Sequence, residues 1–219
     1  MIDPREFTDE MEKYWSKKLR NVPSEALRKV WFQLADVFGR YAIGETNRNE
    51  WTVLQPPTGS GKTQGTIVFC SMLSRINKDL HPGALIVTRL KTDADQIAEK
   101  INELSGNKDE AFPYHSDTKN KLKITDLEKY PVLVITHRAY ELALDLLGQD
   151  GSIQQTWPLF YDWKNNNRRL VVIDEALDIV EHSQASLEGL RQTEATLSQS
   201  IYWCRRKDSN RHRVAPTGF

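Results

Sequence analysis

Apolar residues along the chain fall into two kinds of run, one with helical spacing and one without interruption. Spacing of three and four residues predicts helices over 4–20 and 24–42, the second with Ser24 as its N-cap. Short uninterrupted runs predict buried strands, with a weaker one at 111–114. The strong strands are expected at 51–54, 84–88, 131–136 and 170–173.

Helical patterns follow most of these expected strands. They cover residues 63–76, 92–104, 138–147 and 176–204, and an irregular insertion is expected at 148–167. Strands without interruption, each followed by a helix, are typical of a parallel sheet that is covered on both faces. The expected fold class is therefore α/β, preceded by an N-terminal helical segment.

A glycine-rich turn follows the first expected strand. Strand, glycine turn and helix, in that order, form the context in which such a turn binds phosphate. Gly59 and Gly61 allow backbone N–H groups to approach an anion, and the Lys62 ammonium would reach the β- and γ-phosphates. Pro56 replaces the small residue that opens the full pattern, which costs one N–H at the entrance to the loop. The expected nucleotide-binding residues are Thr58, Gly59, Ser60, Gly61, Lys62 and Thr63.

Two acidic residues end the last expected strand. A charge that enters a dry core must be paired or bound to a metal ion. Asp174 would hold Mg²⁺ together with the Thr63 hydroxyl, and Glu175 would polarise the attacking water as general base, with Lys62 on the phosphates. Alone, the acidic pair would also fit a helix start, where it would satisfy the first N–H groups and the dipole. The order of Lys62 and Asp174 on two expected strands favours the metal site.

These motifs resemble those of superfamily 2 helicases of the DEAD/DEAH-box kind, in their N-terminal RecA-like lobe. Residues 57–63 match motif I, and residues 174–176 match motif II. Residues 85–89 resemble motif Ia, and residues 132–137 resemble motif Ib or Ic. The resemblance covers roughly residues 25–180. It implies a P-loop NTPase with ATP and Mg²⁺ as cofactors and DNA or RNA as partner.

The resemblance also implies further site residues. Motifs Ia and Ib of the family contact the sugar-phosphate backbone, which suggests Arg89, Thr136, His137 and Arg138. The two arginines equally fit solvated ends of a strand and a helix. Gln33 stands where the family often keeps an adenine-reading glutamine, and it also fits a plain helix surface.

Two departures from the family limit these expectations. Leu177 stands where the family usually has Asp or His, so no preference for DNA or RNA follows. A second RecA-like lobe with arginine fingers is not found in the sequence, and such a finger is worth about 10³ to 10⁵ in rate. We therefore expect a partner lobe on a missing segment or an adjacent chain. We expect the chain alone to bind ATP better than it hydrolyses it.

Charge and composition along the chain lead to expectations about its compartment and its division into parts. The chain has 30 basic and 30 acidic residues, so no global field directs it to nucleic acid or membrane. A cytoplasmic protein without a membrane partner is expected, because no apolar run approaches 18 residues and the N-terminus is charged. The expected parts are a helical segment (1–45), the P-loop NTPase lobe (46–204) and a flexible basic tail (205–219).

Two alternative functions stay open at the level of sequence. A P-loop ATPase of another class, such as a DNA-packaging motor, would use the same glycine turn and acidic pair without motifs Ia and Ib. A truncated, non-catalytic module would keep the fold and bind nucleotide without hydrolysing it.

Overall fold

The computed structural model describes residues 2–46, 51–77, 79–118, 124–145, 157–163 and 166–175. The expected helix at 176–204, the tail at 205–219 and the end of the helix at 138–147 lie outside the described residues, wholly or in part. Within the described residues, no helix is both long and apolar enough to cross a membrane.

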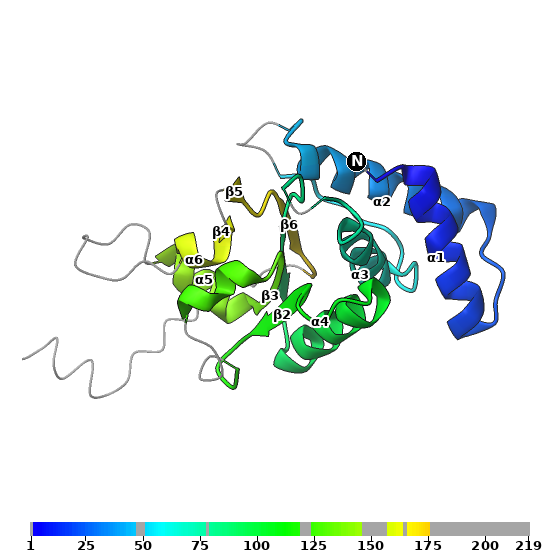
Figure 1. The fold of residues 1–219 in the computed structure, drawn as a ribbon. Coiled ribbons are helices and arrows are strands. Elements are labelled where there is room, and N and C mark those ends of the chain that lie inside the picture. Colours follow the sequence, from blue (N-terminus) through cyan, green and yellow to red (C-terminus); the bar gives the residue numbers. More distant parts are fainter. Residues whose placement is uncertain are drawn as a thin grey trace, which may run out of the picture. The chain divides into compact units, whose positions relative to one another are not determined.

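Four parallel strands form the central sheet (Figure 1). They are β1 (Ala84–Thr88), β2 (Ala111–Tyr114), β3 (Val132–Thr136) and β6 (Leu170–Ile173). The order across the sheet is β2-β3-β1-β6. The parallel sheet predicted from uninterrupted apolar runs is confirmed, and all four strands stand within one residue of their predicted ends.

Helices cover both faces of this sheet (Figure 1). Side chains alternate between the faces along a strand. In β1, Ala84 and Ile86 pack with the N-terminal helices, α3 and α4, whereas Leu85 and Val87 pack with α5, α6 and the turn η1. The bounds are α3 (Lys62–Leu73), α4 (Lys91–Ser105), η1 (Ile124–Lys129), α5 (His137–Asp145) and α6 (Trp157–Tyr161). Both faces are apolar because both are buried, which explains the uninterrupted strand composition.

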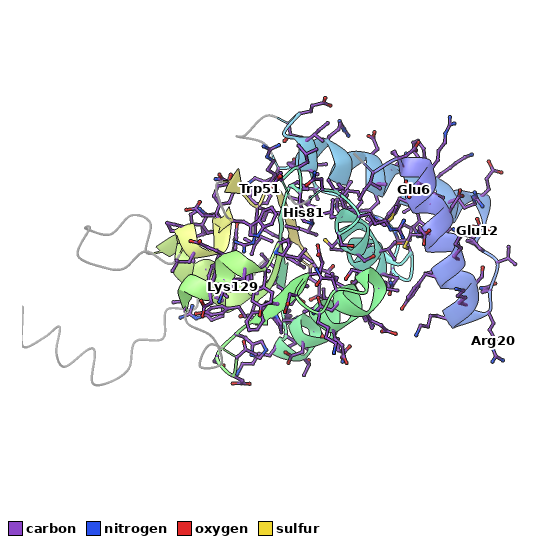
Figure 2. The ribbon with its side chains drawn as sticks, viewed as in Figure 1. Glu6, Glu12, Arg20, Trp51, His81 and Lys129 are labelled. Carbon is purple, nitrogen blue, oxygen red and sulfur yellow. The ribbon has the colours of Figure 1, made fainter. Side chains whose placement is uncertain are left out.

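Two N-terminal helices, α1 (Pro4–Leu19) and α2 (Glu25–Ile43), pack against α3. Both were predicted, and the Ser24 hydroxyl caps α2 by accepting the Leu27 N–H at 3.2 Å. The Phe69 ring of α3 contacts a ring from each helix. Glu6 and Glu12 on α1 (Figure 2) form ion pairs with Arg75 after α3 and with Arg28 of α2.

The strand predicted at 51–54 is not formed, and this prediction is wrong. Trp51 (Figure 2) and Val53 are 65% and 75% exposed. The Thr52 N–H donates to the Tyr41 hydroxyl at 3.0 Å instead of to a neighbouring strand. A β-branched and aromatic run has the composition of a strand, but it becomes one only where a strand edge accepts its N–H groups.

The described part of the insertion at 148–167 is more regular than predicted. It contains α6 and the short antiparallel pair β4 (Asp162–Trp163) and β5 (Asn166–Asn167). Arg168, which follows, is fully buried. Its guanidinium donates to four backbone carbonyls at 2.7–2.8 Å. Those carbonyls belong to Leu127, Tyr130, Phe160 and Asp162. This arginine ties the segment to the entrance of β6.

Candidate functional site

The glycine turn leads directly into the first turn of α3. Gly59 and Gly61 have φ of +80° and +81°, a left-handed conformation that favours glycine. The Ser60 N–H donates to the Pro57 carbonyl at 3.1 Å, which closes the turn. Gly61 is the N-cap of α3 and offers no side-chain hydrogen bond to the helix. The positive end of the helix dipole and its first N–H groups therefore carry no side-chain cap, an arrangement suited to an anion.

Thr63, the second residue of α3, contacts the residue that follows β6. The Thr63 hydroxyl donates to Oδ2 of Asp174 at 2.7 Å, across 111 residues of sequence. The Asp174 N–H donates to the Val87 carbonyl at 2.8 Å, so the backbone continues the β6 ladder one residue past the strand. The structure thus brings the glycine turn and the acidic pair to one place at the carboxyl edge of the sheet.

The oxygen atoms of this pair fit a magnesium ion. Adjacent ligands of an octahedral Mg²⁺ at 2.0–2.1 Å lie about 2.9 Å apart, and the Thr63 and Asp174 oxygens are 2.7 Å apart. Thr63 is exposed and Asp174 half-buried, which leaves room for water and phosphate oxygens as further ligands. Within the described ranges, no group of three His, Cys, Asp or Glu side chains could hold a metal ion. A hydroxyl and one carboxylate are therefore what the chain offers here.

Glu175 is exposed and has an unusual backbone conformation. Its φ is +70°, in the left-handed region, which costs a residue with a Cβ about 1–2 kcal/mol. The chain turns sharply at this residue, directly after Asp174.

Two buried polar atoms without a hydrogen-bond partner lie in or beside the turn. Ser60 Oγ and Gln64 Nε2 are buried, and neither has a partner within the part of the chain that the structure describes. Buried donors without partners are rare in folded proteins. Lys62, between them in sequence, is exposed. Of these three side chains, the exposed Lys62 is the one that a ligand reaches directly.

The residues suggested as nucleic-acid contacts occupy the same edge of the sheet. Thr136 lies beside Thr88 in the β1–β3 register, and its Oγ1 accepts the Ala139 N–H at 3.3 Å, which caps α5. His137 donates from Nε2 to the Asp174 carbonyl at 3.2 Å. The histidine thus joins the start of α5 to the acidic pair.

The two arginines suggested as nucleic-acid contacts lie on the surface. Arg89, directly after β1, is exposed. Arg138 is exposed as well and lies 3.7 Å from the Glu141 carboxylate. Both are accessible to a ligand at the carboxyl edge of the sheet.

Gln33 lies on a different side of α2 from the residue that reaches the glycine turn. That residue is Trp31, whose Nε1 donates to the Ser60 carbonyl at 2.8 Å. Two residues along a helix correspond to a rotation of about 200°. Gln33 is exposed on that other face, so the structure does not bring it to the turn.

Sequence reasoning missed two tryptophans of the N-terminal helices. Trp31 was predicted on the buried face of α2, but its hydrogen bond to Ser60 was not. Trp15 of α1 lies against Gly61, where an added Cβ would stand 2.9 Å from its ring. The signal in the sequence was the helical spacing of apolar residues. This spacing predicts that the residues are buried but not which surface they contact.

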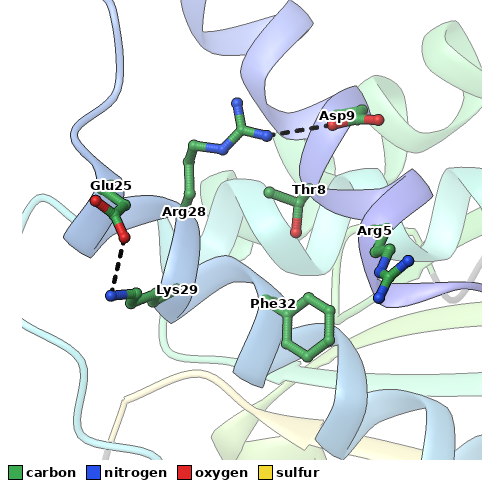
Figure 3. A pocket seen from close by; sticks show the side chains of 7 residues that line it. All are labelled: Arg5, Thr8, Asp9, Glu25, Arg28, Lys29 and Phe32. Atoms are coloured by element: carbon green, nitrogen blue, oxygen red, sulfur yellow. Dashed lines mark hydrogen bonds and ion pairs between the residues drawn. The ribbon is translucent and has the colours of Figure 1, made fainter.

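A surface groove of about 410 Å³ lies elsewhere, between α1 and α2 (Figure 3). None of the residues of the glycine turn lines it. Two of its cations are already paired, Arg28 with Asp9 at 3.5 Å and Lys29 with Glu25 at 3.0 Å (Figure 3). The groove is therefore separate from the site at the carboxyl edge.

Comparison with known proteins agrees with the geometry. The family model for the DEAD/DEAH box helicase matches residues 39–203, which include the glycine turn and the acidic pair. No curated protein matches the chain. With three quarters of its length matched and both motifs meeting at the carboxyl edge of a parallel sheet, the chain belongs to the DEAD/DEAH box helicase family.

Proposed function

We propose that this chain is the Mg-ATP-binding lobe of a nucleic-acid-dependent ATPase, a helicase or translocase. The observation that carries the proposal is the hydrogen bond of 2.7 Å between Thr63 and Asp174. It joins the two motifs that a triphosphate and its metal ion must bridge. The uncapped start of α3 supports it, because backbone N–H groups and the helix dipole favour phosphate there.

Each residue of the site has a distinct task in this proposal. Backbone N–H groups of Gly59 and of residues 61–63, together with the Lys62 ammonium, bind the phosphates. Thr63 and Asp174 hold the metal ion, and Mg²⁺ bound there supplies positive charge against the β- and γ-phosphate oxygens. Glu175 accepts the proton of the attacking water.

The remaining parts of the reaction come from partners. A DNA or RNA backbone would pass the carboxyl edge of the sheet, where the Arg89 and Arg138 guanidinium groups are exposed. His137 donates a hydrogen bond to the Asp174 carbonyl. A shift of α5 on binding of nucleic acid would therefore also displace Asp174, whose carboxylate is proposed to bind the metal ion. A second RecA-like lobe would supply the arginine finger that the transition state requires.

Calorimetry with Mg-ADP and Mg-ATP tests the phosphate site. Lys62→Ala removes one charge-assisted contact of about 1.5–3 kcal/mol, so we expect affinity to fall about 10- to 150-fold. Folding should be unaffected, because the Lys62 side chain is exposed. Lys29→Ala is the matched control, since Lys29 is an exposed lysine whose ion pair with Glu25 lies on α2.

The same titrations test the metal site. Asp174→Asn keeps the size of the side chain and an acceptor for Thr63 but removes the charge that Mg²⁺ requires. We expect EDTA to weaken ADP binding by the wild type and to leave binding by Asp174→Asn unchanged. If Lys62→Ala binds as tightly as the wild type, the phosphate site is refuted. An EDTA effect on Asp174→Asn as large as that on the wild type would refute the metal site.

A further inference from the structure

Two tryptophans from the N-terminal helices contact the glycine turn. Trp31 of α2 is fully buried, and its indole N–H donates to the Ser60 carbonyl at 2.8 Å. The ring of Trp15, from α1, packs against the ring of Trp31 with centroids 5.3 Å apart. Trp15 also lies so close to Gly61 that an added Cβ would stand 2.9 Å from it.

The hydrogen bond from Trp31 sets the orientation of one peptide group in the turn. A peptide unit is planar, and the described residues contain no cis peptide bond. In a trans peptide the carbonyl and the following N–H point in opposite directions. With the Ser60 carbonyl directed at Trp31, the Gly61 N–H is directed away from it. The indole therefore determines which side of the turn receives that donor.

The glycines make this control necessary. Gly61 forms one side of the Ser60–Gly61 peptide, and glycine adopts both left-handed and right-handed backbone angles at low cost. A peptide next to such residues rotates easily unless something holds its carbonyl. Ser60 Oγ gives no help, because it has no hydrogen-bond partner within the described residues. Trp31 is the side chain that holds the peptide in place.

We propose that Trp31 is a positioning residue for phosphate binding: its indole N–H holds the Ser60–Gly61 peptide so that the Gly61 N–H faces the anion. The proposal rests on the proposed nucleotide site and deepens it. Trp15, on α1, packs against Trp31 and covers Gly61. Phosphate affinity is therefore set in part by α1 and α2.

This assignment changes the extent of the site along the chain. Trp15 and Trp31 both precede residue 39, where the match to the family model begins. Sequence patterns divided the chain at residue 45, with the helices as a separate segment. If the proposal holds, this segment is part of the nucleotide site, and a signal that moves α2 would alter nucleotide affinity.

Trp31→Phe is the variant that isolates the indole N–H, because phenylalanine keeps an aromatic ring in the core and removes the donor. One hydrogen bond of this kind changes an equilibrium about 2- to 12-fold. We expect the dissociation constant for Mg-ADP to rise within that range. Phe38→Leu is the matched control: Phe38 is a buried residue of α2 that packs on Phe69. It should lower the melting temperature and leave the affinity unchanged.

A measurement on the wild type guards against a variant that fails to fold. In ¹⁵N-labelled protein, we expect the Trp31 Nε1–H resonance to shift when Mg-ADP is added. A role in packing alone would leave it in place. An unmoved Trp31 resonance, or equal affinity in Trp31→Phe, would overturn the proposal while nucleotide binding by the wild type stands. If the wild type binds no Mg-ADP, the proposed function fails and takes this proposal with it.

Discussion

Replacement of Arg168 by methionine should destabilise the protein strongly, although the residue belongs to no motif. Arg168 is fully buried, and its guanidinium satisfies four backbone carbonyls at 2.7–2.8 Å. Methionine occupies much of the same space but donates no hydrogen bond. The substitution therefore removes four hydrogen bonds: three carbonyls lose the donor that the structure shows for them, whereas the Leu127 carbonyl keeps the Tyr130 N–H at 3.2 Å.

The size of the effect follows from two opposing contributions. Three unsatisfied acceptors at about 2 kcal/mol each, and one lost hydrogen bond to a charged group at about 2 kcal/mol, together cost about 8 kcal/mol. Burial opposes this, because it lowers the pKa of Arg168 to about 9. The drop from 12.5 corresponds to about 5 kcal/mol of disfavoured charge, which methionine does not have to bear. The net loss is then about 3 kcal/mol.

Urea denaturation and thermal melting, both followed by circular dichroism, measure this loss. For a chain of this length, 3 kcal/mol corresponds to a fall in melting temperature of about 6–12 °C. Arg169→Met is the matched control, because its neighbour Arg169 is exposed. It should change the free energy of unfolding by about 0.5 kcal/mol or less.

A third variant separates charge from geometry. Arg168→Lys keeps the charge but has three donors for four carbonyls, so its stability should lie between those of the wild type and Arg168→Met. A free energy of unfolding of Arg168→Met within 1 kcal/mol of that of the wild type would refute the predicted loss. The reasoning is equally refuted if Arg169→Met costs as much as Arg168→Met.

Two further predictions concern the surroundings of the site. Gly61→Ala should lower the free energy of unfolding in urea more than Gly106→Ala does. Both glycines have positive φ, but of the two only the new Cβ at Gly61 meets a neighbour, at 2.9 Å from Trp15. Equal losses would contradict the contact. A hydrogen bond from Lys91 lowers the pKa of Asp117, so Lys91→Ala should raise that pKa in a carboxyl NMR titration, and an unchanged value would refute the pairing. Because the folded pKa of this carboxyl lies below the unfolded one, the stabilisation is present above the unfolded value and is lost as pH falls through the folded pKa.

Much of the sheet could be predicted because strands that are buried on both faces have an uninterrupted apolar sequence. β1, β3 and β6 are short apolar runs, and each run matched its strand closely. Residues 51–54 have the same composition and are not a strand. What separates them is the partner of the Thr52 N–H, which is the Tyr41 hydroxyl. No local pattern carries that information.

The candidate site was predictable to the extent that it rests on short motifs. Lys62, Thr63 and Asp174 stand in the order that a phosphate and metal site requires, and the structure brings the last two into contact. Arg168 and Trp31 could not be foreseen in their roles. An arginine in sequence suggests a solvated surface, and a tryptophan on a helix face suggests packing. Their hydrogen bonds go to backbone carbonyls. Every residue has such a carbonyl, so the sequence does not indicate which one is bound.

The left-handed backbone at Glu175 allows chemistry and folding to be separated at this position. Asparagine adopts such angles more readily than glutamate, so Glu175→Asn would remove the carboxylate while easing the backbone. Most substitutions of a proposed general base leave open whether activity was lost through damage to the fold. Here the neutral replacement is also the conformationally relaxed one, so a loss of ATPase activity measured together with the second lobe, at undiminished stability, would place the defect in proton transfer.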